Sequence, residues 1–327
     1  MALAPAAEFG IQGSQFTLDG KPAFLAGASY YGGLGASEET LRRDLDDLKG
    51  AGFSWIRVWA TWAAFGEDVS AVDLETGEPR EPYLARLRAL LGECDRRGIA
   101  VNVTLSRGNG TTGPSKIQDL KTHRRAVETL VTSLRDRRNW WLDLSNERNI
   151  RDKRFTSLED LAALRSRARE LDSRRLVTAS HVGDPTRGEL RAYLETAGLD
   201  FISVHRDRSE SSPAQTEVQA RECRTLLKEL KREVPLLYDE PFRRGYGSWA
   251  PRAEDFAADM KGALAGGAAG WCFHNGSTRG TPDEKPRRSF DLREMRLFES
   301  LDAEERKAID AIHKILDGTG PTAPASR

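Results

Sequence analysis

The sequence predicts a (β/α)8 barrel, an α/β fold in which eight parallel strands lie inside a ring of helices. Apolar runs of strand length alternate with longer amphipathic segments along the 327 residues, which predicts strand–helix–strand units with parallel strands. The apolar runs show little inside–outside alternation, as expected for strands that are buried on both faces. Eight such units in about 290 residues fit one barrel domain, with a doubly wound open sheet as the alternative.

A short β-hairpin is predicted before the barrel, over residues 11–24, because its Asp19-Gly20 pair is a favoured two-residue turn. The last ten residues, GTGPTAPASR, are rich in Gly, Pro, Ser and Thr, a composition typical of disorder. No interior linker divides the chain. The predicted organisation is a flexible N-terminus over 1–8, one barrel over 9–316 and a disordered tail over 317–327.

The strands and helices of the barrel are predicted in strict alternation. The first helix begins after Ser37, which can cap it, and ends at Gly50 or Gly52. The strands are predicted over residues 23–30, 54–60, 99–106, 140–145, 175–180, 200–205, 235–240 and 269–274. The later helices are predicted near residues 83–97, 119–137, 157–171, 187–196, 214–233 and 253–265, with helical segments then reaching residue 315.

Composition excludes several classes of partner and cofactor. The 50 basic and 50 acidic residues balance, which argues against nucleic acid or an anionic membrane as the partner. No apolar run approaches the roughly 20 residues of a membrane span. The three cysteines, Cys94, Cys223 and Cys272, form no C-x-x-C and are expected to be buried thiols. The five histidines are scattered without an H-E-x-x-H motif, so we expect no metal and no cofactor.

The first ten residues, MALAPAAEFG, lack the basic and apolar regions of a signal peptide. Two locations remain open: secreted or periplasmic, if a signal peptide was trimmed, and cytoplasmic otherwise. The oligomeric state is not predicted by the sequence.

Polar and aromatic residues follow the predicted strands at the end where barrel enzymes carry their active sites. Asn146 and Glu147 follow the fourth strand, and Glu240 ends the seventh. These strands lie across the barrel mouth from each other, so the two glutamates can converge. A converging carboxyl pair is what cleavage of a glycosidic bond requires. The sequence therefore predicts a carbohydrate substrate.

Several motifs resemble glycoside hydrolase clan A, in particular the cellulase-like family 5. The stretch LSNER is similar to the Asn-Glu signature at the fourth strand, and PLLYDEPF to the motif of the seventh-strand nucleophile. FTLDGKPAFLAGASYY and GFSWIRVWATW resemble the first two strands, DFISVH the sixth and AGWCFH the eighth. The resemblance covers roughly residues 9 to 315, and it lies in the joint order of the motifs.

The resemblance implies a retaining double displacement in which Glu147 is the acid/base and Glu240 the nucleophile. Asn146 would bind the sugar 2-hydroxyl, and Arg57 would keep Glu240 ionised, because a nearby cation favours the charged form. Further substrate-binding residues are expected around this pair. They are His205, which would orient the nucleophile or contact sugar, Trp271, which would stack under the ring, and the cleft residues Tyr30, Trp62 and Tyr246.

The chain departs from the family pattern at several positions. Arg148 stands where a proline usually follows the acid/base, and the tyrosine expected after the sixth strand is absent from His205-Arg206-Asp207. Tyr30 or Tyr246 is expected to replace that tyrosine. Arginines at the rim indicate either solvated charge or an acidic sugar. These rim arginines are Arg107, Arg148, Arg206 and Arg208.

The function predicted from these features is a retaining glycoside hydrolase acting on a β-linked oligo- or polysaccharide of β-glucan or β-mannan type. A transglycosylase would use the same intermediate. A non-catalytic carbohydrate-binding barrel is the alternative from another class. Geometry distinguishes them, because retaining pairs hold their carboxyl groups about 5–5.5 Å apart and inverting pairs about 6.5–9.5 Å.

Overall fold

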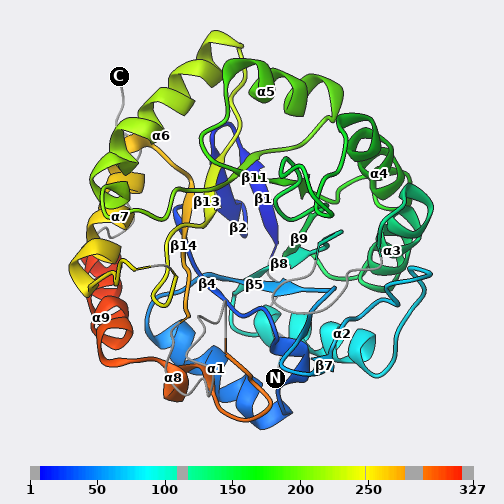
Figure 1. Ribbon diagram of the computed structural model, residues 1–327, viewed down its shortest axis with the longest axis horizontal. Coiled ribbons are helices and arrows are strands. Elements are labelled where there is room, and N and C mark those ends of the chain that lie inside the picture. Colours follow the sequence, from blue (N-terminus) through cyan, green and yellow to red (C-terminus); the bar gives the residue numbers. More distant parts are fainter. Residues whose placement is uncertain (1–7, 109–116, 247, 277–289, 319–327) are drawn as a thin grey trace.

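The computed structural model describes residues 8–108, 117–246, 248–276 and 290–318, and it has the predicted barrel architecture. A ring of helices surrounds the central strands (Figure 1). Apart from Glu8, the predicted flexible N-terminus lies outside the described residues. The last helix reaches Gly318, and the rest of the predicted tail, residues 319–327, also lies outside them.

The barrel sheet is parallel, in the order β10-β9-β8-β5-β4-β14-β13-β12-β11. The predicted fifth strand forms both ends of this order, because its first part pairs with β9 and its second part with β12. The prediction of eight strands around a closed barrel is therefore confirmed. The strands are β4 (Leu25–Ser29), β5 (Trp55–Trp59), β8 (Ala100–Thr104), β9 (Trp140–Asp143), β10 (Val177–Thr178), β11 (Ser180–Val182), β12 (Ile202–His205), β13 (Leu236–Glu240) and β14 (Gly270–Phe273).

The helices follow the strands as predicted, with small shifts at their ends. Ser37 caps the first helix through its side chain, which accepts from the Thr40 amide. The sixth helix ends four residues earlier than predicted, and Lys231 just beyond it has a positive φ. The helices are α1 (Glu38–Gly50), α2 (Tyr83–Asp95), α3 (Leu120–Ser133), α4 (Leu158–Leu171), α5 (Arg187–Arg191), α6 (Ser212–Glu229), α7 (Ala253–Gly266), α8 (Leu297–Ser300) and α9 (Ala303–Gly318), with short helical turns η1 (Gly33–Gly35) and η2 (Ala192–Thr196).

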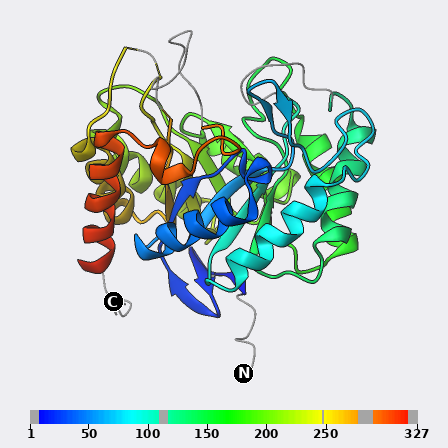
Figure 2. The ribbon, with the colours of Figure 1, turned by 90° about the horizontal axis from the view of Figure 1, so that it is seen from below.

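The predicted N-terminal hairpin is part of a three-stranded antiparallel sheet of β1 (Phe9–Gln12), β2 (Gln15–Leu18) and β3 (Lys21–Ala23). The Asp19-Gly20 turn joins β2 to β3, and both turn residues have a positive φ. Figure 2 shows this sheet at one end of the barrel, away from the short strands β6 (Ala63–Ala64) and β7 (Glu67–Asp68).

Aromatic side chains fill the barrel above that sheet. Phe9 packs on Trp141 with ring centroids 4.5 Å apart, and Trp55 lies 5.3 Å from the same indole. Gly27 leaves room for Trp55, because a Cβ at Gly27 would collide with the indole ring. Apolar side chains therefore close the end of the barrel that faces the N-terminal sheet. The polar interior residues of the site lie toward the opposite end.

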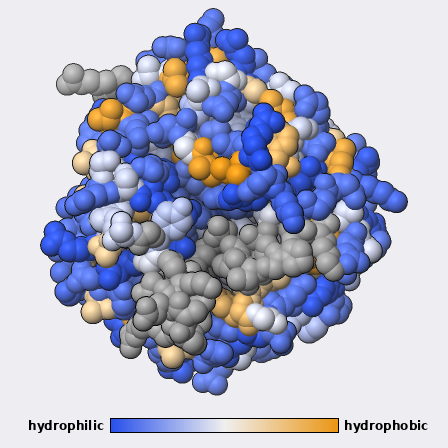
Figure 3. Space-filling view, viewed as in Figure 1, coloured by the Kyte–Doolittle hydropathy of each residue, from blue (hydrophilic) through white to orange (hydrophobic). Residues whose placement is uncertain are grey.

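The surface and the thiols agree with the composition. The face seen in Figure 3 is mostly hydrophilic, and none of the described helices is long and apolar enough to cross a membrane. Cys94, Cys223 and Cys272 are free and buried, as predicted.

Candidate active site

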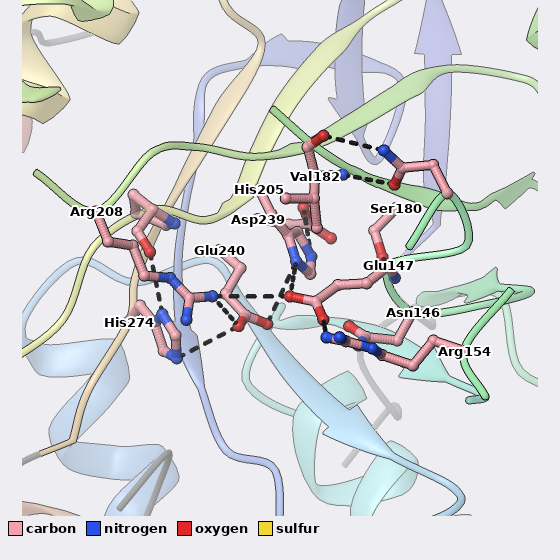
Figure 4. A network of polar contacts seen from close by, with 12 residues as sticks. Asn146, Glu147, Arg154, Ser180, Val182, His205, Arg208, Asp239, Glu240 and His274 are labelled. Carbon is pink, nitrogen blue, oxygen red and sulfur yellow. Dashed lines mark hydrogen bonds and ion pairs between the residues drawn. The ribbon is translucent and has the colours of Figure 1, made fainter. Parts of the chain in front are cut away.

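Glu147 and Glu240 meet at the mouth of the barrel (Figure 4). Glu147 follows β9 and Glu240 ends β13, and the two residues are only 4% and 0% exposed. One oxygen of each carboxylate and one ring nitrogen of His205 lie within 4.8 Å of one another. The barrel thus brings together, from strands far apart in the sequence, the two carboxylates that the motifs single out.

Arg57 is fully buried on β5 and connects the pair to the residues around it. Its Nη1 donates to Oε2 of Glu240 at 2.6 Å, and its Nη2 donates to Asp143 and Asn146, each at 2.9 Å. Such charge-assisted hydrogen bonds fix orientation as well as charge. The Asn146 oxygen is thereby occupied, whereas its amide nitrogen has no hydrogen-bond partner among the described residues. That nitrogen can donate to a ligand.

A β-bulge at the end of β13 turns two consecutive carboxylates toward the barrel interior. The pairing with β12 shifts by one residue at this point, so that His205 pairs with Glu240 and Asp239 is left over. A bulge of this kind re-aims side chains that would otherwise alternate between faces. Asp239 lies 3.8 Å from Nε of Arg57, whereas Glu240 contacts Nη1 of the same guanidinium.

Tyr31 supplies the hydroxyl that was expected from Tyr30 or Tyr246. Its hydroxyl donates to Oε2 of Glu240 at 2.9 Å. The neighbouring Tyr30 is also buried, but its hydroxyl donates to Asp44 of α1 at 3.0 Å. Consecutive residues at the end of a strand face opposite sides, so only one of the two tyrosines enters the mouth, and the structure does not bring Tyr30 to the carboxylates.

His205 lies between the carboxylates, fully enclosed. Its Nδ1 is 3.3 Å from Oε1 of Glu147, and its Nε2 is 3.5 Å from Asp239 and 3.2 Å from Nη1 of Arg57. Burial alone would lower the pKa of His205, but the charges of Glu240 and Asp239 and the hydrogen bonds to Asp239 and Glu147 raise its pKa to about 9. The imidazole is therefore protonated at neutral pH.

Glu147, His205 and Glu240 are also, within the described ranges, a group that could hold a metal ion. The sequence predicts all three residues at the site, but it contains no metal-ligand motif that would join them. A histidine ligand must be neutral, whereas the pKa of His205 is raised to about 9. Both carboxylates also accept from arginines. The donor set therefore fits ion pairs better than a metal ion.

The backbone around Glu147 is held in an unusual conformation. Glu147 has a φ of 50°, and its amide donates to Oγ of Ser180 at 3.1 Å. Arg148, which replaces the proline of the family pattern, is buried and donates to the Thr156 carbonyl at 2.9 Å and to the Tyr193 hydroxyl at 3.2 Å. The departure at Arg148 is thus structural, because this arginine anchors the loop that carries Glu147.

Two arginines bind the carboxylates from the side of the mouth (Figure 4). Arg154, on the loop after β9, donates to Oε2 of Glu147. Arg208, on the loop after β12, donates to Oε1 of Glu240 at 2.6 Å and lies 3.9 Å from Oε1 of Glu147. Each carboxylate of the pair is therefore in a partly buried ion pair.

His274 is a further fully buried residue of the site. Its Nδ1 lies 3.2 Å from the Pro241 carbonyl, which can only accept, so Nδ1 carries the proton of the neutral ring. Burial lowers the pKa of His274 well below its usual value. Its Nε2 is then an acceptor, which lies 3.8 Å from Oε1 of Glu240 and has no hydrogen-bond partner among the described residues.

Trp271, the expected sugar platform, is not in the mouth. It is fully buried, and its indole nitrogen donates to Asp259 of α7 at 2.6 Å. Strand alternation is the reason: the side chains of Cys272 on β14 and of His274 just after it face the interior, so Trp271 faces the helices. The residue of this segment that contacts the carboxylate pair is His274.

Trp62 and Tyr246 lie beside residues that contact the carboxylates. The Trp62 ring is buried and packs 5.5 Å from the ring of Tyr31. Tyr246 is 45% exposed, and the guanidinium of Arg208 lies 4.7 Å from its ring centroid. Trp62 thus packs behind Tyr31, and Tyr246 lies beside Arg208 on the exposed side of the mouth.

The other rim arginines bind the protein itself. Arg107 donates to Asp160 at 2.6 Å, and Arg206 is buried against Asp259 and Thr216. These arginines are structural. Among the four arginines of the predicted rim, Arg208 is the one that reaches the carboxylate pair.

Five residues that complete the site are not among the site residues predicted from the sequence: Tyr31, Asp143, Arg154, Asp239 and His274. Asp143 had a usable signal, because it lies two residues after Trp141 on the same strand and therefore shares its interior face. The direction of Asp239 depends on the bulge, and the contact of Arg154 depends on loop geometry, for which no simple sequence pattern exists. Alternation allows one of Tyr30 and Tyr31 to enter the mouth, but the sequence does not show which one.

Comparisons with known proteins agree with this architecture. Neither a protein-family model nor a curated protein matches the sequence. An endo-1,4-β-mannanase structure from Rhizomucor miehei aligns with a TM-score of 0.68 at 13% identity, over 95% of this chain and 99% of that one. A β-1,4-D-mannanase from Cryptopygus antarcticus aligns with a TM-score of 0.64 at 15% identity, over 94% of this chain and 95% of that one.

A glycoside hydrolase family 5 structure from Bacteroides vulgatus aligns with a TM-score of 0.66 at 15% identity, over 94% of this chain and 70% of that one. At such identities the likeness concerns the fold. The chain therefore has the barrel fold of the family 5 glycoside hydrolases, and the resemblance seen in its motifs is confirmed at the level of the fold.

Proposed function

We propose that this chain is a retaining glycoside hydrolase that cleaves a β-linked oligo- or polysaccharide, with residues 9–316 as its single catalytic unit. The observation that carries the proposal is the pair Glu147 and Glu240, whose nearest oxygens lie within 4.8 Å. Retaining pairs hold their carboxyl groups about 5–5.5 Å apart, and inverting pairs leave room for a water. The short separation supports double displacement.

In the first step an oxygen of Glu240 attacks the anomeric carbon, and a carbon–oxygen bond forms as the glycosidic bond breaks. The leaving oxygen takes a proton from Glu147. In the second step a water gives its proton to Glu147 and attacks the anomeric carbon, which releases Glu240 as a carboxylate. A sugar hydroxyl in place of that water would give transglycosylation.

The surrounding residues support these roles through charge and direction. Arg57 and Tyr31 both donate to Oε2 of Glu240, which stabilises the carboxylate and leaves Oε1 as the attacking atom. The amide nitrogen of Asn146 is positioned to donate to a sugar hydroxyl beside the reacting carbon. The protonated imidazole of His205 lies between the carboxylates and offsets their mutual repulsion.

The substrate class follows from the fold neighbours only as a proposal. Two of them are β-1,4-mannanases, and a mutant family 5 mannosidase from Rhizomucor miehei was solved in complex with mannosyl-fructose. We therefore place β-mannan and β-glucan type glycans first in the substrate panel.

The test is turnover of aryl β-glycosides and β-glycans by the wild type, Glu147→Gln and Glu240→Gln. The expected result is turnover by the wild type and its loss in both variants. Glu210→Gln is the control, because Glu210 is an exposed carboxylate on the loop after β12. Turnover that persists in either active-site variant would show that the chosen carboxylate is wrong.

Azide rescue separates the two roles. In Glu240→Gly azide enters from the side of the missing nucleophile and yields an α-glycosyl azide. In Glu147→Gly it replaces water on the glycosyl-enzyme and yields the β-azide. Exchanged products would reverse the assignment of the two glutamates.

A non-catalytic carbohydrate-binding barrel is the second candidate, and one observation favours it. The ion pair of Glu147 with Arg154 favours the ionised carboxylate, whereas the acid role requires a proton. Sugar binding without turnover on any substrate of the panel would support this alternative.

A further inference from the structure

Arg208 occupies the space in which the proposed chemistry takes place. Its Nη2 lies 2.6 Å from Oε1 of Glu240 and 3.9 Å from Oε1 of Glu147, so the guanidinium lies between the two carboxylates. The side chain is 12% exposed. Its guanidinium also lies 4.7 Å from the ring centroid of Tyr246 on the open side of the mouth. Figure 4 shows the guanidinium reaching toward the pair from the loop after β12.

This position prevents attack by Glu240. Its Oε2 already accepts from Arg57 at 2.6 Å and from Tyr31 at 2.9 Å. The remaining oxygen, Oε1, is the atom that can reach an anomeric carbon, and Arg208 holds it. A sugar ring can therefore approach Oε1 only after Arg208 has moved away.

Moving Arg208 separates its guanidinium from the buried carboxylate of Glu240, and a buried charge that loses its partner is destabilised. A substrate that offers a new anion compensates for this loss, whereas a neutral sugar does not. A planar guanidinium pairs best with a planar carboxylate, through two parallel hydrogen bonds.

We propose that Arg208 selects a substrate in which the reacting sugar, or the one next to it, carries a carboxylate, as in a uronic acid. The inference rests on the proposed glycosidase function and names its substrate class. Arg208 pairs with Glu240 in the free protein and with the sugar carboxylate in the complex, and the exchange frees Oε1 for attack.

The charges of the site balance, so an anionic ligand is not excluded by net repulsion. Among the described side chains of the cluster, the four carboxylates are balanced by three arginines and the protonated imidazole of His205. The carboxylates are those of Asp143, Glu147, Asp239 and Glu240, and the arginines are Arg57, Arg154 and Arg208. Arg243 adds a cation 5.3 Å from the ring centroid of Tyr246. Asp152, which pairs with Arg154 at 2.6 Å, adds one negative charge, so the described cluster is neutral and an incoming carboxylate meets no net negative charge.

The experiment compares two matched substrates, 4-nitrophenyl β-D-glucuronide and 4-nitrophenyl β-D-glucoside, which differ only in the carboxylate. The enzymes are the wild type, Arg208→Ala, Arg208→Lys and the control Arg151→Ala. Arg151 is an exposed arginine of the loop after β9 whose guanidinium lies over Phe155. Arg151→Ala therefore removes rim charge without touching the carboxylate pair.

We expect the wild type to prefer the glucuronide in kcat/KM. Arg208→Ala should lose about tenfold or more on the glucuronide and keep or gain activity on the glucoside, so that the preference inverts. Arg208→Lys should fall between, because an ammonium keeps the charge but loses the planar fork. A wild-type preference for the glucoside, or equal losses on both substrates in Arg208→Ala, would overturn the proposal.

Binding tests the proposal without any turnover. Calorimetry measures the binding of D-glucuronate and of D-glucose to the wild type and to Arg208→Ala. Circular dichroism checks that the variant is folded. Binding of glucuronate that depends on Arg208, with no hydrolysis of either glycoside, would refute the hydrolase and retain the specificity. Equal glucuronate binding by both proteins, or none by the wild type, would refute the specificity.

Discussion

The Tyr31 hydroxyl donates to Oε2 of Glu240 at 2.9 Å, although 209 positions separate the two residues in the chain. A hydrogen bond to a charged group contributes about 1.5–3 kcal/mol. We expect Tyr31→Phe to lower kcat by about tenfold to a hundredfold, because the proposed nucleophile loses a donor. Steady-state kinetics on the best aryl glycoside provide the measurement.

Tyr30→Phe is the matched control, because the adjacent tyrosine bonds to Asp44 outside the mouth. It should reduce the free energy of unfolding by about 1–3 kcal/mol and leave kcat near the wild-type value. If Tyr30→Phe lost as much activity as Tyr31→Phe, the two hydroxyls would not have the separate roles inferred from their partners.

The raised pKa of His205 predicts a loss of stability at alkaline pH. Its pKa is about 9 in the folded protein and 6.5 in the unfolded chain, so protonation stabilises the fold. This contribution is complete below pH 6.5 and disappears as the pH rises through about 9. It amounts to a few kcal/mol. Urea unfolding between pH 6 and 9.5 should show the decline in the wild type.

A His205→Gln variant isolates this contribution from other groups that titrate in the same range. The variant should be less stable than the wild type at pH 6, because a buried cation among carboxylates is lost. The difference between the two proteins should shrink as the pH approaches 9.5. A constant difference over the whole range would contradict the raised pKa.

Trp271 should prove to be a stability residue. Its indole donates to Asp259 at 2.6 Å and faces the helices. Trp271→Phe is expected to lower the free energy of unfolding by about 1–3 kcal/mol and to leave KM unchanged. His274→Ala, which alters a side chain 3.8 Å from Glu240, should change kcat/KM instead. A raised KM in Trp271→Phe would restore the platform role predicted from the sequence.

Gly27→Ala should destabilise the barrel, since its Cβ would collide with the Trp55 ring. Overpacking of this kind costs about 1–3 kcal/mol. Gly50→Ala is the control: its Cβ meets nothing at the end of α1, and alanine there should be neutral to about 1 kcal/mol more stable. Thermal unfolding of the two variants should therefore shift in different directions or by clearly different amounts.

The sequence predicts the barrel because the same pattern, an apolar run followed by an amphipathic segment, recurs in every strand–helix unit. Each buried strand appears in the sequence as an apolar run, such as the run that precedes Asn146 and Glu147. The end of the run marks the end of the strand. The level of a side chain along a strand is therefore predictable. For this reason Glu147 and Glu240 lie at the rim that the sequence predicts for them.

Side-chain direction near strand ends is harder to predict. Trp271 was expected in the mouth because it is aromatic and lies on the eighth strand, but alternation from His274 would have placed it outside. Tyr30 and Tyr31 differ by one position and face different sides. Arg154 reaches Glu147 from a loop, and loop conformation depends on contacts with distant parts of the chain, which a local pattern does not contain.

The extra residue in β13, Asp239, also determines how far Glu240 lies along the strand. Each residue of a strand advances the chain by about 3.3 Å along that strand. Without Asp239, Glu240 would directly follow Tyr238. Its side chain would still face the interior, but it would lie one residue deeper in the barrel. The bulge therefore moves the Glu240 carboxylate toward the mouth, where it meets Glu147 from the opposite side of the barrel. The depth of the site in the barrel depends on this single inserted residue.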